Sequence, residues 1–138
     1  MILTDTGFWL ALLNSRDRYH RQAVVALEEL DEPLITTWPV VTETTYMLLT
    51  RLGVDAQLRF LDNLERDYIQ LFDVEQGHLS RIKVLMKKYK SLPMDLADAS
   101  LVIAAEELND GRILSTDLRD FNAYRWKNHR PFLNLLLP

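Results

Sequence analysis

Short apolar runs alternate with longer segments of helical character along the whole chain. The apolar runs are long enough only for strands and lie at 2–4, 34–36, 68–72, 112–115 and 132–136. The segments between them have the length or the apolar spacing of helices, at 8–13, 18–31, 39–52, 55–66, 79–89 and 95–108. Short strands separated by helices are typical of parallel sheets with helices on both faces. The sequence therefore predicts an α/β fold with a central, mainly parallel sheet.

Length and composition predict a single domain over residues 1–138. The chain has 48% apolar and 26% charged residues, which is typical of an ordered globular protein. It has no Cys, which excludes disulfides and thiolate metal sites and fits a reducing compartment. The first residues form no secretory signal and no run is long enough to span a membrane, so we expect a soluble, cytoplasmic protein with no membrane partner. The net charge of −4 weakly disfavours a broad nucleic-acid-coating surface.

Several carboxylates interrupt segments that otherwise carry no charge. Asp5 is the only charged side chain in 1–15, and Glu43 is the only one in 33–50. Asp95 and Asp98 are the only two in 91–105. Acidic side chains are rarely buried unless something pairs with them. With no Cys and three widely separated His residues, a hard divalent cation with oxygen ligands is the expected partner.

The predicted elements bring four of these acids to one edge of the sheet. Asp5 and Asp117 each follow a predicted strand, and the carboxyl ends of strands are where open α/β sheets bind ligands. We expect Glu43 and Asp98 in the first turn or so of their helices, where the helix dipole favours negative charge. A cluster of four carboxylates is mutually repulsive unless a cation or protons neutralise it. The pattern therefore favours a metal site.

Each acid also has a simpler interpretation. Asp98 could serve the helix dipole behind an Asp95 cap, Asp117 could form an Asx turn, and Asp120 could be a surface charge. A basic cluster around Trp126 could contact phosphates, although a solvated surface is the more common role of such residues. We expect the aromatic side chains of Phe8, Trp9 and Trp38 to lie in the core rather than to form a binding platform.

The four acidic motifs together resemble those of PIN-domain nucleases, particularly VapC-type toxins. They read Ile-Leu-Thr-Asp-Thr-Gly around Asp5, Val-Val-Thr-Glu-Thr around Glu43, Met-Asp-Leu-Ala-Asp-Ala-Ser-Leu around Asp98 and Leu-Ser-Thr-Asp-Leu-Arg-Asp-Phe around Asp117. Each motif alone is weak, and the order and spacing of all four carry the resemblance. It covers nearly the whole chain and implies a three-layer α/β/α sandwich.

The resemblance also implies a function and partners. It implies hydrolysis of RNA phosphodiesters with Mg²⁺ or Mn²⁺, an antitoxin protein as partner, and a homodimer. In the implied mechanism Asp5, Asp98 and Asp117 hold one or two cations that activate a water, and Glu43 ligates or orients that water. Asp120 competes with Asp117 for the fourth position, and the motif leaves the role of Asp95 open.

Other functions remain compatible with the sequence. The triplet Asp5-Thr6-Gly7 occurs in aspartic proteases, but their chemistry needs two carboxylates that share a proton, and the family with this triplet is rich in β-structure. A housekeeping RNA-processing nuclease of the same fold is a second alternative. A PIN-like binding module without catalysis is a third. Metal-dependent cleavage would separate an enzyme from a module.

Overall fold

Five strands form one parallel sheet in the computed structural model, which describes residues 1–138. The strand order is β3-β2-β1-β4-β7, and every neighbouring pair is parallel. The strands are β1 (Ile2–Thr4), β2 (Leu34–Thr37), β3 (Ile69–Phe72), β4 (Arg112–Leu114) and β7 (Leu133–Asn134). Four of them lie within the apolar runs predicted from the sequence, and β2 extends one residue beyond its run, to Thr37.

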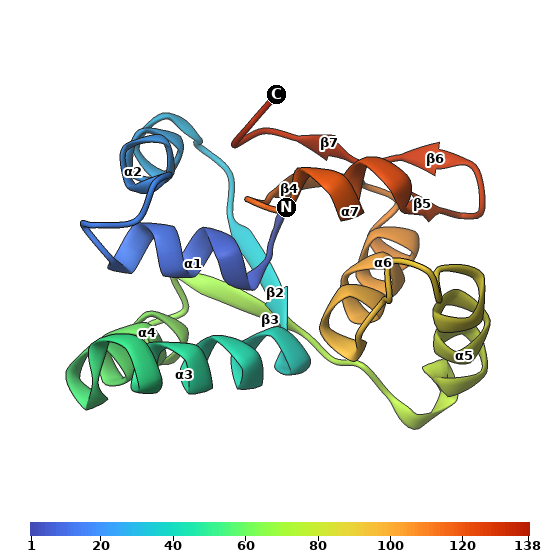
Figure 1. Ribbon diagram of the computed structural model, residues 1–138, viewed down its shortest axis with the longest axis horizontal. Coiled ribbons are helices and arrows are strands. Elements are labelled where there is room, and N and C mark those ends of the chain that lie inside the picture. The colour runs from blue at the N-terminus through green and yellow to red at the C-terminus, as the bar shows by residue number, and fades with distance from the viewer.

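Helices connect successive strands of this sheet (Figure 1). They are α1 (Thr6–Leu13), α2 (His20–Glu29), α3 (Trp38–Leu52), α4 (Val54–Glu65), α5 (Leu79–Lys88), α6 (Leu96–Leu108) and α7 (Leu118–Ala123), with a 3₁₀ turn at Gln76–His78 before α5. The sequence predicted the first six. It missed α7 and the small antiparallel pair β5 (Arg125–Trp126) and β6 (Arg130–Pro131), which are too short to show a periodic pattern.

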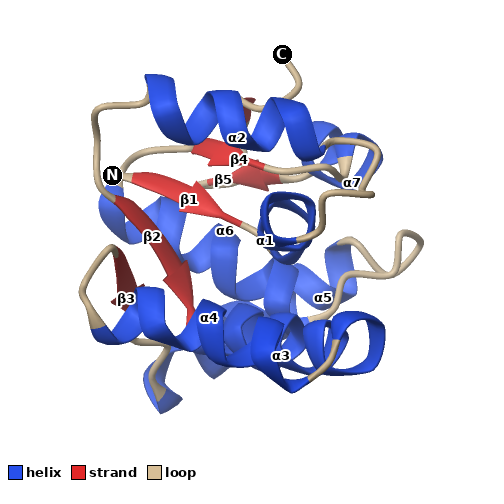
Figure 2. Ribbon diagram, turned by 90° about the vertical axis from the view of Figure 1, so that its left-hand side faces the viewer, coloured by secondary structure: helices blue, strands red, loops and turns tan.

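Neighbouring residues of each strand face opposite sides of the sheet, and each side has its own core. Leu3, Ile35 and Ile113 pack with α5 and α6. Their neighbours Ile2 and Leu34 pack with α1, α3 and α4 on the other side, as the two-residue period of a strand requires. Figure 1 shows α1 to α4 on one side of the strands and α5 and α6 on the other, and Figure 2 shows the same layers after a quarter turn. The predicted three-layer α/β/α sandwich is confirmed.

One tryptophan, Trp38, does not lie where the sequence predicts. Trp9 is buried in the core, as predicted. Trp38 is 52% exposed, so the prediction that it lies in the core is wrong. Trp126 is buried, and its Nε1 donates a hydrogen bond to the carbonyl of Pro131, which leaves it unavailable as a stacking surface among the basic residues. None of the helices combines the length and apolar character needed to span a bilayer.

Candidate active site

A cavity of about 330 Å³ lies at the carboxyl ends of the strands, where the strand order changes direction. From β1 the chain proceeds to β2 and β3 on one side, and it returns later to β4 on the other. Loops that leave neighbouring strands diverge at such a switch point, which makes it the usual ligand site of open α/β sheets. The acidic residues lining this acidic cavity are Asp5, Glu43, Asp95, Asp98, Asp117 and Asp120.

Asp5 connects β1 to α1 and is almost fully buried. It caps α1, because its Oδ1 accepts a hydrogen bond of 2.9 Å from the backbone N–H of Phe8. The hydroxyl of Ser115, which follows β4, donates to its Oδ2. Burial raises the pKa of Asp5 to about 7 against the effect of these two donors, and the nearby carboxylates of Asp117 and Glu43 raise it further. A cation bound beside this buried carboxylate would stabilise its charged form.

Asp98 lies in the first turn of α6, as predicted, and faces the cavity. The hydroxyl of Tyr124 donates a 2.7 Å hydrogen bond to its Oδ2. Burial raises the pKa of Asp98 to about 7, with further contributions from Asp95, Asp5 and Asp117. Asp95 caps α6 by accepting from the backbone N–H of Asp98, which confirms the predicted cap. Asp95 and Asp98 therefore form the cap of α6 and also line the cavity.

Glu43 lies in the second turn of α3, one turn later than expected, and its side chain is half-buried. It lines the cavity between α3 and the start of α6. Burial raises its pKa, and the carboxylate of Asp95 adds to the effect. Glu43 is the only charged residue in segment 33–50, and its side chain faces a cleft, as expected.

Asp117 and Asp120 both line the cavity but differ in their partners. Asp117 caps α7 through a 3.1 Å hydrogen bond from the backbone N–H of Asp120, and burial raises its pKa. Asp120 is the more buried of the two. Its Oδ1 accepts from Nε of Arg119 at 3.0 Å. Asp120 thus has a cationic partner within the chain.

Gly7 allows the loop after β4 to approach the first turn of α1. A Cβ at this position would lie 2.0 Å from Oγ1 of Thr116 and 3.5 Å from Oδ1 of Asp5. No side chain fits that space, so glycine is required for this close approach. The contact keeps Asp5 and Asp117, which lie 112 positions apart, at the same cavity.

Sequence reasoning missed the two side chains that donate hydrogen bonds to these acids. Ser115 has a weak local signal, because it lies two residues before Asp117 and accepts a hydrogen bond from its backbone N–H. Tyr124 has no local signal, since it lies 26 positions from Asp98. Each donor fixes the orientation of one carboxylate, which is the role of residues that orient metal ligands.

The chemistry of the cavity suits a hard cation. Its acidic side chains supply carboxylate oxygens, and no Lys, Arg or His lines it. Mg²⁺ and Mn²⁺ prefer such oxygen ligands. As placed, no group of three acidic or histidine side chains has the spacing of a finished metal site. Carboxylates without a counter-charge repel one another, and a cation would neutralise that repulsion.

Comparisons with known proteins agree with this architecture. The family model of the PIN domain matches residues 2–127. Ribonuclease VapC26 of Mycobacterium tuberculosis is 27% identical over 124 residues, which cover 90% of this chain and 92% of that protein. The crystal structure of M. tuberculosis VapC20, described as a sarcin-ricin loop cleaving toxin, superposes with a TM-score of 0.84 at 21% identity and covers 95% of this chain and 100% of that one, so the two share a fold. This chain belongs to the PIN-domain family.

Proposed function

We propose that this protein is a ribonuclease that hydrolyses RNA phosphodiesters with Mg²⁺ or Mn²⁺ in the acidic cavity. The observation that carries the proposal is a cavity at the switch point of a PIN domain with six acidic side chains and no Lys, Arg or His in its lining. The raised pKa values of Asp5 and Asp98 indicate carboxylates that the chain itself does not compensate. The relative VapC26 is named a ribonuclease, which supports the same activity.

The four acids predicted from the sequence take distinct roles in this proposal. Asp5, Asp98 and Asp117 would hold the cation, which would supply a water of lowered pKa and positive charge beside the phosphate. Glu43, which also lines the cavity, would ligate the same cation or orient the attacking water. Asp117 is preferred over Asp120 because Asp120 is paired with Arg119. Asp95 is assigned to the cap of α6.

The hydrogen-bond donors behind the acids prepare the site for this chemistry. Ser115 fixes one oxygen of Asp5, and Tyr124 fixes one oxygen of Asp98. Each carboxylate therefore keeps one orientation toward the cavity, and the substrate does not have to order it. The expected substrate is single-stranded or looped RNA, whose backbone is accessible where bases are unstacked.

We further propose that the protein is the toxin of a toxin-antitoxin pair and acts on RNA in the cytoplasm. The description of VapC20 as a toxin supports this role. A cavity with no basic residue in its lining is a natural target for an Arg or Lys of an antitoxin, which would pair with the carboxylates and silence the enzyme. Housekeeping RNA processing by the same chemistry is the alternative.

A homodimer is part of the same proposal. Several large apolar side chains on α3 and α4 are more than a third exposed, among them Tyr46, Leu49, Leu52, Val54 and Leu58. Exposed apolar groups gathered on adjacent helices mark an interaction surface. Light scattering of the purified protein would test the assignment, and a monomer at all concentrations would overturn it.

A cleavage assay tests the enzymatic proposal. Purified protein should cleave single-stranded RNA with Mg²⁺ or Mn²⁺ and should lose this activity in excess chelator. Activity that persists in chelator would exclude the mechanism. A protein that binds RNA but never cleaves it would instead be a binding module.

Expression in cells separates toxin from housekeeping enzyme. Induction of the wild-type chain should stop growth, Asp5→Asn should be harmless, and co-expression of a small neighbouring gene should restore growth. Unimpaired growth at high levels of an active enzyme would exclude the toxin role and leave the ribonuclease assignment standing.

A further inference from the structure

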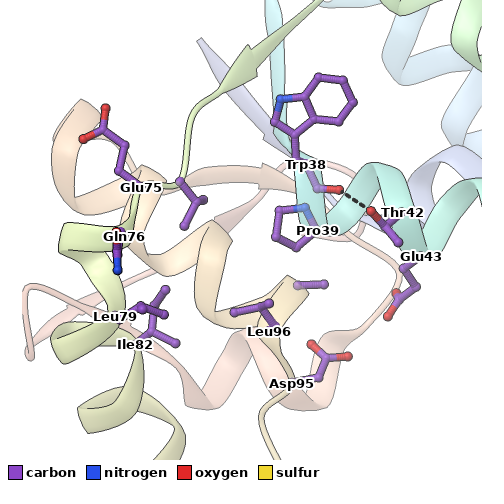
Figure 3. A pocket seen from close by; sticks show the side chains of 12 residues that line it. Trp38, Pro39, Thr42, Glu43, Glu75, Gln76, Leu79, Ile82, Asp95 and Leu96 are labelled. Atoms are coloured by element: carbon purple, nitrogen blue, oxygen red, sulfur yellow. Dashed lines mark hydrogen bonds between the residues drawn. The ribbon is translucent and has the colours of Figure 1, made fainter.

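A second cavity, of about 710 Å³, opens beside the acidic cavity and shares Glu43, Asp95 and Ala97 with it. We call it the apolar groove. Figure 3 shows Trp38 and Pro39 of α3 on one side of the groove, Leu79 and Ile82 of α5 on the other, and Leu96 of α6 between them. The groove therefore joins three helices at the mouth of the candidate active site.

The groove exposes apolar groups that a folded chain normally buries. Trp38 is 52% exposed, Leu79 50% and Leu96 46%. The other two tryptophans, Trp9 and Trp126, are 2% and 6% exposed. An apolar patch of this kind beside a polar site is typical of a ligand-binding surface.

The lining limits the chemistry of the ligand. It contains no Lys, Arg or His, so it has no side chain that recognises a phosphate. Its polar groups are the side chains of Thr42, Glu43, Glu75, Gln76 and Asp95, around a largely apolar floor. The volume is within the range of roughly 300–1,000 Å³ found for small-ligand sites. A flat, neutral, aromatic group fits these properties.

We propose that the apolar groove binds the base of the nucleotide next to the scissile phosphate, stacked on the indole of Trp38. The inference rests on the proposed ribonuclease function. Because the groove and the acidic cavity share Glu43 and Asp95, a strand whose phosphate reaches the acids carries its neighbouring base to the groove. Every base has an aromatic face, so stacking on Trp38 strengthens binding without demanding one sequence.

This continuity with the acidic cavity favours a base over the other occupant suited to an apolar groove, a segment of a protein partner. An inhibitory partner needs only to place a basic side chain among the acids, and it does not require the groove for that. An RNA substrate extends to both sides of the cleaved bond, and the groove provides a site for the nucleotide on one side. The binding energy gained there holds the scissile phosphate in place.

Fluorescence titration tests the groove without relying on cleavage. The probe is a hexanucleotide of 2′-O-methyl ribose with uncharged methylphosphonate linkages, which needs no cation and has no free 2′-hydroxyl to attack its own backbone. Since Trp38 is the one largely exposed tryptophan, saturable quenching reports on its contact with a base. Leu79→Glu should weaken binding several-fold. Val84→Glu, at a position on α5 that is 54% exposed and outside the groove, should leave it unchanged. Quenching that an abasic probe reproduces would overturn the proposal.

Steady-state kinetics give a second, independent test. Trp38→Ala should raise KM roughly 5- to 100-fold, the range expected from loss of one stacked base, with kcat nearly unchanged. Trp38→Phe should retain most of the affinity. The matched control is Tyr68→Ala, because Tyr68 is 65% exposed, lies at the amino end of β3 and does not line the groove, which lies past the carboxyl ends of β2 and β3.

An abasic substitution beside the cleaved bond completes the design. It should weaken binding to the wild-type enzyme and have little further effect in Trp38→Ala, because the two changes remove the same contact. Equal kinetics for Trp38→Ala and Tyr68→Ala would overturn the proposal, as would a Trp38→Ala variant that loses only binding to a protein partner. If no RNA is cleaved at all, the ribonuclease assignment fails, and the quenching experiment still decides what the groove binds.

Discussion

Two acidic clusters lie at opposite ends of β4, and they differ in how their charge is compensated. At the amino end, Nη2 of Arg112 contacts Oδ2 of Asp110 at 2.7 Å and Oε1 of Glu32 at 3.1 Å. Hydrogen bonds from Arg112 lower the pKa values of both carboxyls. At the carboxyl end, burial raises the pKa values of Asp5 and Asp98 to about 7. The pKa of the same chemical group is thus below its ordinary value at one end of the strand and above it at the other.

Asp110 and Glu32 therefore stabilise the structure, whereas Asp5 and Asp98 remain available to bind a ligand. Arg112 supplies the positive charge for its cluster from within the chain. No basic side chain lines the acidic cavity and only Asp120 pairs with an Arg, so compensation for Asp5 and Asp98 must come from protons, a cation or a partner. A carboxylate whose pKa is raised in a cleft is a candidate functional group for this reason. Four predictions test whether the two clusters differ as the comparison claims.

The largest expected effect is on catalysis. Asp5→Asn and Asp98→Asn should each reduce RNA cleavage by at least about 100-fold, because even residues that only support metal ligands cost roughly 10- to 100-fold. Asp110→Asn removes one charge from the compensated cluster and should leave cleavage unchanged. Single-turnover rates and circular dichroism would check activity and fold together. Equal losses for Asp110→Asn and Asp98→Asn would contradict the distinction.

A smaller effect is expected from the donors behind the acids. Ser115→Ala and Tyr124→Phe each remove a hydrogen bond to a carboxylate and should weaken Mg²⁺-dependent activity by roughly 10- to 100-fold. Higher Mg²⁺ should restore part of the rate, because the ligand remains and only its orientation is lost. A metal titration of the cleavage rate measures this. Loss of activity that no metal concentration restores would assign these side chains another role.

The pH dependence of stability should have opposite signs for the two clusters. The pKa of Asp5 is about 7 in the folded state, whereas its ordinary value is 3.8. Between pH 3.8 and pH 7, the folded state therefore keeps a proton that the unfolded state has lost. The free energy of unfolding should therefore fall as pH rises from 5 to 8 in chelator, by at most about 3 kcal/mol for Asp5. Glu32 and Asp110 have lowered pKa values, so the stability that they contribute is lost as pH falls below their ordinary values of 4.5 and 3.8, the opposite sign, and it stays constant from pH 5 to 8.

Denaturant unfolding at several pH values measures this slope. Mg²⁺ should restore more stability at pH 8 than at pH 5, since only the ionised carboxylates bind it. Asp5→Asn should flatten the dependence. A metal-free protein that becomes steadily more stable from pH 5 to pH 8 would show that the cavity acids are already compensated.

The smallest effect is expected at the compensated cluster. Arg112→Ala should lower Tm by a few degrees at most, because partly exposed ion pairs contribute little to stability. RNA cleavage should not change. Differential scanning calorimetry and the cleavage assay would measure both, and a cleavage defect would mean that the two ends of β4 are coupled.

Local patterns were sufficient for most of the fold. The strands of the sheet and the first six helices have the apolar runs or spacing that burial against a neighbouring layer requires. The helix α7 and the β5–β6 pair were missed because six and two residues are too few to establish a period. Trp38 was misplaced because its size favours the core, whereas it begins α3 at the rim of the apolar groove.

The sequence by itself determined the order of strands and helices and the placement of four acids at predicted strand ends and helix starts. Burial excludes charge, so a lone carboxylate in an uncharged segment is visible without a structure. Only the tertiary structure decided that Ser115 reaches Asp5 across 110 positions, that Tyr124 reaches Asp98 across 26, and that an apolar groove adjoins the acids. These contacts depend on how the layers pack, and local periodicity records only which face of each element is buried.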